Sequence, residues 1–369
     1  MKRNLFGAVA ALTAIGLALT GCGKSKNATS TSVGAKDAKA GIELALVTDS
    51  GTIDDKSFNQ GSWQGLEKYA KDNNKTAKYY QPTEVSDESY LSAIQLAVKG
   101  GAKVIVCPGF NFETSVWEAQ SLYPDVDFII LDGAPHNDDS SDTTIAKNTV
   151  SIFYAEQQAG FLAGYAAVKE GNTKLGFMGG VAVPAVVRYG YGFIQGADYA
   201  AKEFGIKDVS CKVTYVGNFQ ATPENMAKAA SWYNEGTQLI FACGGAVGNS
   251  VMKAAETAGR TVIGVDVDQA SESATVITSA MKNLSQSVYD TLAAYYNGSF
   301  PGGKSETLTA KENGVQLPMA SSKFNKFTQA DYDALFAKLV SGEITVLDDS
   351  AASSAGKLPT SIVKVEELN

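Results

Sequence analysis

The chain has 369 residues, of which 44% are hydrophobic and 19% are charged, and its formal net charge is -8. This length and composition are ordinary for a globular protein with room for two cores. The acidic balance argues against nucleic acid or an anionic membrane surface as a partner, because both repel negative charge.

The N-terminal segment has the pattern of an export signal. Lys2 and Arg3 precede the apolar run Leu5 to Leu19, which is too short to span a membrane and ends at small residues. The run leads into Leu-Thr-Gly-Cys, which resembles the lipobox of bacterial lipoproteins, where the cysteine becomes the lipid-modified first residue. We therefore predict a lipoprotein signal peptide over residues 1–21 and a lipid anchor on Cys22.

Residues 22–40 are rich in Ser, Thr, Lys, Ala and Gly and show no apolar periodicity. This composition predicts a flexible tether between the membrane and the folded part. Removal of residues 1–21, which contain two basic and no acidic side chains, changes the formal charge from -8 to -10. The mature chain is therefore more acidic than the precursor.

Cysteine and histidine usage disfavours several kinds of site. Cys107, Cys211 and Cys243 lie in or beside β-like apolar runs without any C-x-x-C pair, so we expect buried free thiols, with a single disulfide as the alternative. The one histidine, His136, lies in a polar loop. We assign no metal site, no Ser/His/Asp triad and no other catalytic residue.

From Ile42 the chain alternates short apolar runs with amphipathic segments, the pattern of a parallel sheet with right-handed crossovers. The predicted strands are Ile42–Val47, Thr76–Tyr80, Val104–Cys107 and Phe128–Leu131. The helices expected between them are Ser57–Lys71, Asp87–Lys99 and Phe112–Ser121.

A second series follows an acidic loop at 137–141 and a short run at 143–150. Its predicted helices are Tyr154–Val168, Tyr189–Phe204, Pro223–Asn234 and Ser250–Ala258. Its predicted strands are Lys174–Met178, Ser210–Tyr215, Gln238–Ala242 and Val262–Asp266. The C-terminal part adds a run at 274–278, helices at 282–296 and near 329–340, and edge elements at Gly342–Val346 and in the final SIVKVEEL.

Two such series predict two lobes, each a mostly parallel sheet flanked by helices, with a ligand cleft at the hinge. We assign residues 41–150 and about 279–320 to lobe 1, and residues 151–278 and about 321–369 to lobe 2, because chains of this type cross between lobes more than once.

Three predicted strands end in an acid. Asp49 follows Thr48 at the start of the stretch TDSGTIDDKSFNQ, and Asp132 and Asp266 end the runs FIILD and TVIGVD. In open α/β sheets ligands bind outside the carboxyl ends of the strands. Asp also favours turns and helix caps, but three acids at one rim favour a ligand with several hydroxyl donors.

Aromatic side chains occur beside the same rim. Phe58 lies in the first loop, and Phe241 lies near the end of a lobe 2 strand before the glycine-rich turn CGGAVG. Each is compatible with a core position, but a pair facing across the cleft would hold a flat ring. A ring joined to a polyol is a nucleoside. The glycine-rich turns lack the lysine and spacing of nucleotide-binding motifs.

A nucleoside hydrolase is the alternative from another functional class, because TDSGTIDD is similar to the calcium motif D-T-D-P-G-x-D-D. However, Val47 stands in place of the leading Asp, Ser50 replaces Pro, and one extra residue separates Gly51 from Asp54. Loss of a carboxylate and a shifted register disfavour an oxygen-only Ca²⁺ shell.

Several motifs together resemble the basic membrane protein family of bacterial lipoproteins, which includes purine nucleoside receptors of ABC transporters. They are the lipobox, TDSGTIDDKSFNQ, YPDVDFIILDG, VGNF, IFACGGAVGNS, IGVDVDQ and TSAMKN. The resemblance covers Ile42 to about Leu292 and implies the type I periplasmic-binding-protein fold. It also implies a lipid-anchored receptor on the extracytoplasmic face that delivers a purine nucleoside to a permease, acts as a monomer and needs no cofactor.

The resemblance also implies roles for individual residues. Phe58 and Phe241 would hold the purine, and Asp49, with Asn59 beside it, would read the base. The ribose would be bound by Asp132, Gly245, Asp266 and Lys282. The turn after Phe241 is one residue shorter than is usual in the family. A sugar or signal-molecule receptor of the same fold is the alternative, and neither the preferred nucleoside nor the permease is defined by the sequence.

Overall fold

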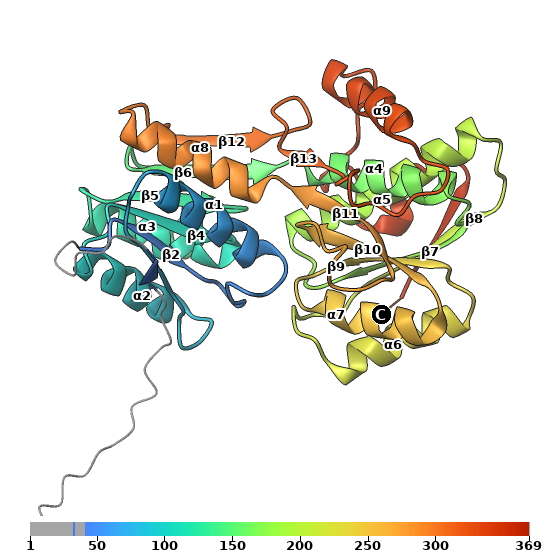
Figure 1. Ribbon diagram of the computed structural model, residues 1–369, viewed down its shortest axis with the longest axis horizontal. Coiled ribbons are helices and arrows are strands. Elements are labelled where there is room, and N and C mark those ends of the chain that lie inside the picture. Colours follow the sequence, from blue (N-terminus) through green and yellow to red (C-terminus); the bar gives the residue numbers. More distant parts are fainter. Residues whose placement is uncertain (1–31, 34–40, 369) are drawn as a thin grey trace, which may run out of the picture.

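The computed structural model describes residues 32–33 and 41–368, which form two α/β lobes (Figure 1). The predicted signal peptide and Cys22 lie outside the described residues, as does the tether except for the short strand β1, Ser32–Val33. Within the part described, the predicted class of mostly parallel sheets flanked by helices is confirmed.

Lobe 1 is built on a sheet with the strand order β1-β3-β2-β4-β5-β6-β12, in which only the β1–β3 pairing is antiparallel. Its other strands are β2 (Leu44–Val47), β3 (Ala77–Tyr80), β4 (Val104–Pro108), β5 (Asp127–Leu131), β6 (Thr149–Tyr154) and β12 (Lys304–Leu308). Its helices are α1 (Phe58–Asp72), α2 (Asp87–Lys99), α3 (Glu113–Leu122) and α8 (Leu284–Tyr296), with a 3-10 turn at Phe110–Phe112.

Lobe 2 contains the sheet β13-β11-β10-β9-β7-β8-β14, antiparallel only between β11 and β13. The strands are β7 (Lys174–Gly179), β8 (Val209–Tyr215), β9 (Leu239–Cys243), β10 (Thr261–Asp266), β11 (Val276–Lys282), β13 (Val315–Gln316) and β14 (Val363–Glu367). The helices are α4 (Glu156–Lys169), α5 (Pro184–Glu203), α6 (Pro223–Asn234), α7 (Val247–Ala258) and α9 (Gln329–Ser341), with a 3-10 turn at Ala355–Lys357.

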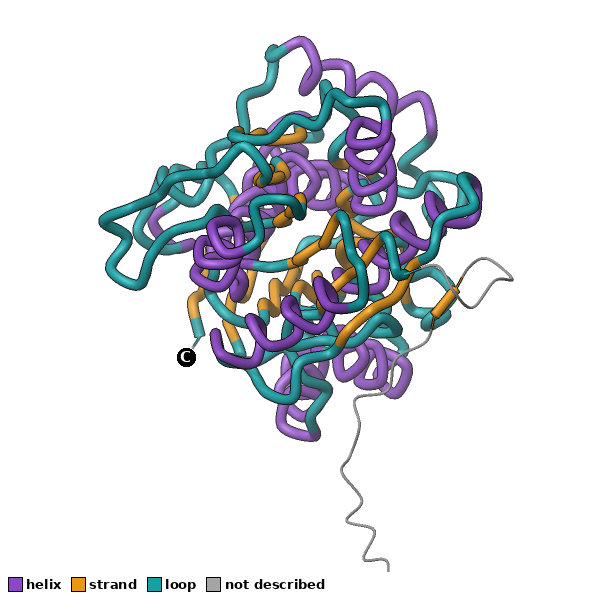
Figure 2. Tube along the Cα trace, turned by 90° about the vertical axis from the view of Figure 1, so that its left-hand side faces the viewer, coloured by secondary structure: helices purple, strands orange, loops and turns teal. Residues whose placement is uncertain are grey.

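Both faces of each sheet are covered by helices, which explains why the strands read as continuous apolar runs. In β2, Leu44 and Leu46 join one buried cluster, and Ala45 and Val47 join another on the opposite face. Figure 2, which looks at the molecule from the lobe 1 side, shows strands lying between helices. This layering leaves the carboxyl ends of the strands as the edge where polar side chains can gather.

Helices α4 and α5 of lobe 2 pack backbone against backbone. A Cβ atom added at Gly164 of α4 would lie 2.0 Å from the Phe193 carbonyl oxygen, and one added at Gly192 of α5 would lie 2.0 Å from the Gln157 carbonyl oxygen. No side chain fits at such distances, so only glycine permits this approach. The two helices therefore form a single tightly packed unit.

The chain crosses between the lobes three times, from β6 to α4, from β11 to α8 and from β12 to β13. The sheets divide the chain at residues other than those predicted. The boundaries at 150 and 279 fall inside β6 and β11, and β13 of lobe 2 lies within the range 279–320 that was assigned to lobe 1. Each division must lie beyond the end of a strand, because pairing to neighbours holds the whole strand in one sheet.

Helices with clear start signals agree with their predicted bounds. Helix α6 begins at Pro223, and the Thr222 side chain accepts a hydrogen bond from the Asn225 amide. The predicted start of α5 at Tyr189 is wrong, because Pro184 occupies its first turn and extends it toward the N-terminus. The edge element predicted at Gly342–Val346 is also wrong, since this segment follows α9 as an irregular turn.

Candidate functional site

Two of the predicted strand-end acids have an unusual backbone conformation. Asp132 directly follows β5 and Asp266 ends β10, with φ angles of +55° and +65°. Left-handed backbone is uncommon in residues other than glycine and persists where the surrounding structure holds it. The Asp132 amide is held by a 2.9 Å hydrogen bond to the Ile152 carbonyl of β6. Both carboxylates line the same cavity.

The third acid, Asp49, is positioned by Asn59. Asn59 Nδ2 donates to Asp49 Oδ1 at 2.8 Å and to Asp55 Oδ2 at 2.9 Å, and Asn59 Oδ1 accepts from the Asp49 amide at 3.1 Å. Burial raises the pKa of Asp49 to about 6, partly offset by hydrogen bonds from Gly51 and Asn59. Asn59 therefore acts mainly within the protein, where it fixes the Asp49 carboxylate at the cavity wall.

The cavity has a volume of about 460 Å³ and is lined by residues of both lobes. This volume is within the range of sites for small organic molecules. The structure brings seven of the eight predicted ligand-binding residues to its wall. They are Asp49, Phe58, Asn59, Asp132, Gly245, Asp266 and Lys282.

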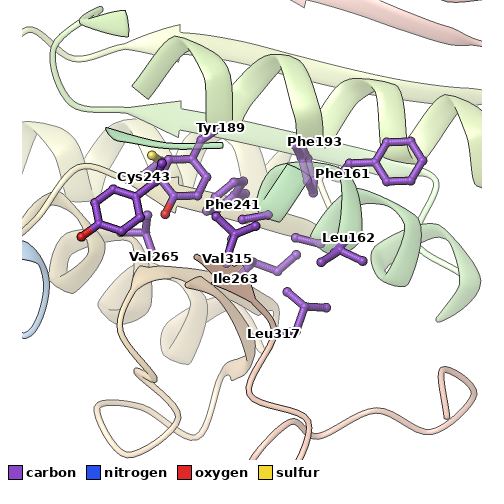
Figure 3. Close-up of a cluster of buried hydrophobic side chains, with 14 of the residues drawn as sticks. Phe161, Leu162, Tyr189, Phe193, Phe241, Cys243, Ile263, Val265, Val315 and Leu317 are labelled. Atoms are coloured by element: carbon purple, nitrogen blue, oxygen red, sulfur yellow. The ribbon is translucent and has the colours of Figure 1, made fainter. Parts of the chain in front are cut away.

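The eighth residue, Phe241, is not at the cavity wall. It is the third residue of β9, has 0% exposure and lies in the lobe 2 core (Figure 3). Its ring makes edge contacts with Phe177, Tyr189 and Phe193 at centroid distances of 5.4 to 5.7 Å. The prediction that Phe241 faces the cleft is therefore wrong, because its side chain points to the α4–α5 face of the sheet.

Phe219 is an aromatic residue of lobe 2 that does line the cavity, in the loop after β8. Its ring packs over Gly180, where an added Cβ would lie 2.5 Å from Phe219 Cδ1. Its carbonyl oxygen accepts a 3.1 Å hydrogen bond from the Ala246 amide, which ties this loop to the turn after β9. The VGNF segment was the available sequence signal. Phe58 and Phe219 thus approach the cavity from different lobes.

A buried charge cluster surrounds Lys282, the last residue of β11, whose side chain is 3% exposed. Its Nζ atom contacts Asp132 and lies 3.1 Å from Glu156 Oε1 and 3.9 Å from Asp266 Oδ1. Burial opposes the charged form of Lys282, but the three carboxylates together raise its pKa above the ordinary range. Burial raises the pKa of Asp132 to about 7, against the lowering effect of Lys282.

Glu156 is part of this cluster and was not predicted. It is the first residue of α4, is fully buried, and lies 2.5 Å from Arg188 Nε. Arg188 Nη1 lies 3.3 Å from Asp349 Oδ1 near the C-terminal end of the chain. The only signal in the sequence was that Glu156 is the single acid of a helix whose other residues are mostly apolar or small. The cluster links the first two crossings, after β6 and after β11.

Direct hydrogen bonds join the two lobes beside the cavity. Ser57 Oγ donates to Asp266 Oδ2 at 2.5 Å, and Gln269 Nε2 donates to the Lys56 carbonyl oxygen at 2.7 Å. The loop before α1 therefore contacts the carboxyl end of β10 in lobe 2. A relative rotation of the lobes has to change or pivot about these contacts.

The described cysteines, the histidine and the possible metal ligands lie as follows. Cys107, Cys211 and Cys243 are buried and free, as predicted. His136 pairs with Glu113 at 3.3 Å, and no group of three or more His, Cys, Asp or Glu side chains in the described residues is arranged to hold a metal ion. None of the described helices is long and apolar enough to cross a membrane.

Two α/β lobes joined by three crossings, with a cavity lined from both, are the architecture of the periplasmic-binding-protein type. Residues 42–350 match the family of PnrA-like ABC transporter substrate-binding proteins, and the chain belongs to this family. The predicted resemblance to basic membrane proteins is confirmed.

Relatives and solved structures agree with this assignment. The chain is 29% identical over 368 residues to the ABC transporter nucleoside-binding protein BmpA of Lactococcus lactis subsp. cremoris, covering 92% of this chain and 98% of that protein. Basic membrane protein D of Borreliella burgdorferi is 31% identical over 300 residues, covering 80% and 82%. An ABC transporter solute-binding protein from Aeropyrum pernix K1 has the same fold, with a TM-score of 0.74 at 20% identity, covering 85% and 95%.

Proposed function

We propose that this substrate-binding protein takes nucleosides, with purine nucleosides preferred, and delivers them to the permease of an ABC importer. The observation that carries the proposal is the cavity itself. Phe58 and Phe219 enter it from opposite lobes, and Asp132, Asp266 and Lys282 lie in the same wall. A flat ring and a group of hydroxyls are the ligand features that this combination suits. The name of the lactococcal relative supports the same ligand class.

The aromatic part suits a base. The faces of Phe and of heterocyclic bases stack, at roughly 1 to 3 kcal/mol per base. The pair that supports stacking is Phe58 with Phe219 in place of the predicted Phe58 with Phe241, because Phe219 lines the cavity and Phe241 does not. Asp49 reaches the same cavity as an acceptor for a base N–H.

The charged part suits a sugar. Carboxylate oxygens accept hydrogen bonds from hydroxyl groups, and Asp132 Oδ1 has no hydrogen-bond partner among the described residues. Lys282 is held between acids, so it can donate to a ligand oxygen while its charge stays balanced. A phosphate would instead add about two negative charges next to these acids.

A thermal-shift and calorimetric screen tests the proposal. Adenosine, guanosine, inosine and uridine are compared with free bases, with adenosine monophosphate and with simple sugars. A ligand at 100 times its dissociation constant stabilises the folded state by about 2.7 kcal/mol. Purine nucleosides should raise the melting temperature most and the monophosphate should bind far more weakly. Binding of sugars without nucleosides would establish the sugar receptor, and release of free base from inosine would establish a hydrolase.

We also propose that the mature protein is held at the extracytoplasmic face of the membrane by lipid on Cys22, and that it works as a monomer that closes by rotation of its lobes around the ligand. A Cys22→Ser chain should appear in the medium or as unprocessed precursor. A variant that stays processed and membrane-bound like the parent would contradict the anchor.

A further inference from the structure

Two buried polar atoms in the cavity wall lack a protein partner. Of the side chains that the structure describes there, only Asp132 Oδ1 and the Tyr189 hydroxyl are fully buried atoms without a hydrogen bond. Buried polar groups are nearly always paired, because an unpaired one has lost its hydration without compensation. Each of these atoms is therefore suited to meet a group of the bound molecule.

The Tyr189 side chain is held in place by its surroundings. It is 1% exposed, and its ring contacts the Phe241 ring edge-on, at 5.7 Å between centroids and an interplanar angle of 90°. A Cβ added at Gly160 of α4 would lie 2.2 Å from the Tyr189 carbonyl oxygen, so the α5 backbone cannot shift here. Figure 3 shows Tyr189 with Cys243 and Val265 at the end of the core cluster, and all three line the cavity.

The hydroxyl of Tyr189 supplies a neutral donor beside the charged groups of the cavity wall. Lys282 Nζ lies 5.4 Å from the Tyr189 ring centroid but contacts carboxylates, and Arg188 is held by Glu156 and Asp349. Burial, followed by the nearby charge of Asp266, raises the pKa of Tyr189 well above its ordinary value. The hydroxyl therefore keeps its proton throughout the physiological pH range.

We propose that Tyr189 is a further specificity-determining residue, whose hydroxyl donates a hydrogen bond to an oxygen of the ligand's sugar. This inference rests on the proposed nucleoside function. The sugar is the relevant part because Tyr189 lies beside Asp266 and Lys282, the groups assigned to it. A bound nucleoside would then pair a donor with Asp132 Oδ1 and an acceptor with Tyr189.

The test uses Tyr189→Phe, which removes one oxygen and keeps the ring packed against Phe241. Tyr90→Phe is the matched control. The Tyr90 hydroxyl is also buried and unpaired, and its ring packs against Phe112 at 4.5 Å, but Tyr90 does not line the cavity. Dissociation constants are measured for adenosine, its 2′-, 3′- and 5′-deoxy analogues, its carbocyclic analogue without the ring oxygen, and adenine.

We expect Tyr189→Phe to weaken adenosine binding about tenfold, as for one buried hydrogen bond, and to leave adenine binding and the ligand-free melting temperature unchanged. The analogue that lacks the oxygen bound by Tyr189 should have the same dissociation constant as adenosine in Tyr189→Phe. The parent and Tyr90→Phe should bind that analogue more weakly than they bind adenosine. These ratios are taken within each protein, so a change in folded fraction does not affect them.

Equal adenosine affinity in the parent and Tyr189→Phe would overturn the inference while leaving the nucleoside function in place. An equal loss against every ligand, or the same loss in Tyr90→Phe, would also overturn it. A parent protein that binds no nucleoside would refute the proposed function and this inference together.

Discussion

Replacement of Phe241 or Phe219 by alanine should have opposite consequences, because one ring lies in the core and the other lies at the cavity wall. In Phe241→Ala the edge contacts of the ring with Phe177, Tyr189 and Phe193 are lost, and a cavity remains in the lobe 2 core. In Phe219→Ala only the contacts of a half-buried ring at the edge of the core, including its packing over Gly180, are lost. The pair therefore separates fold stability from ligand affinity.

The magnitudes follow from these environments. Truncation of a buried Phe costs about 3 to 5 kcal/mol. For a cooperative unit of about 200 residues, 1 kcal/mol corresponds to a shift of about 2 to 4 °C, so Phe241→Ala should melt about 6 to 20 °C below the parent. Loss of one stacked ring at Phe219 should weaken purine nucleoside binding roughly 5- to 150-fold, from about 1 to 3 kcal/mol. Its ligand-free melting temperature should stay close to that of the parent.

Differential scanning calorimetry without ligand and titration calorimetry with adenosine measure both quantities on the same samples. Phe58→Ala serves as the matched variant from lobe 1, and it should behave like Phe219→Ala. The reasoning would be refuted if Phe241→Ala kept its melting temperature and lost binding, or if Phe219→Ala melted early with unchanged affinity.

Three further predictions concern buried charge and close packing. Because burial raises the pKa of Asp49 from 3.8 to about 6, the stability that its protonated form contributes is present below about pH 4 and is lost as the pH rises through 6. The free energy of unfolding of Asp49→Asn, measured in urea, should therefore gain about 2 to 3 kcal/mol on that of the parent from pH 4 to 7, and a pH-independent difference would contradict this. Glu156→Gln should destabilise the fold by about 3 to 5 kcal/mol, since Arg188 loses its buried partner, and a double variant that also replaces Arg188 by Met should recover part of the loss. Gly192→Ala should cost about 1 to 3 kcal/mol or more by overpacking, whereas Gly248→Ala, where an added Cβ meets its first neighbour only at 3.7 Å, should be neutral or stabilising; similar unfolding midpoints for these two variants would be the contrary result.

The sequence predicts the sheets and most of the helices well because the physical signals are local. Strands covered on both faces appear as apolar runs, and α2 has the predicted bounds Asp87–Lys99 because Ser86 caps it. Asp49, Asp132 and Asp266 are also predictable, since a parallel sheet brings the carboxyl ends of its strands to one edge. The positions of these three acids follow from the sheet topology alone.

The wrong or missing predictions concern residues whose role depends on the direction in which the side chain points. Phe241 belongs to β9 and Phe219 follows β8, so both lie near the carboxyl ends of strands. A strand that is apolar on both faces shows no alternation of polar and apolar residues. The sequence therefore does not tell which of the two rings points into the core. The buried position of Glu156 was equally hidden, because an acid in the first turn of a helix is ordinarily exposed and favourable there. Only the fold brings it to Arg188 and Lys282.

The three crossings between the lobes also bear on how ligand binding can be measured. Three chain segments join the lobes, and the proposed closure by rotation would change the distance between the lobes. A fluorescent donor on α2 and an acceptor on α6 would therefore suffice to follow occupancy in real time. The three cysteines of the described chain are buried, so thiols introduced on those exposed helix faces would take the dyes selectively, and the protein is suited to serve as a single-distance optical sensor.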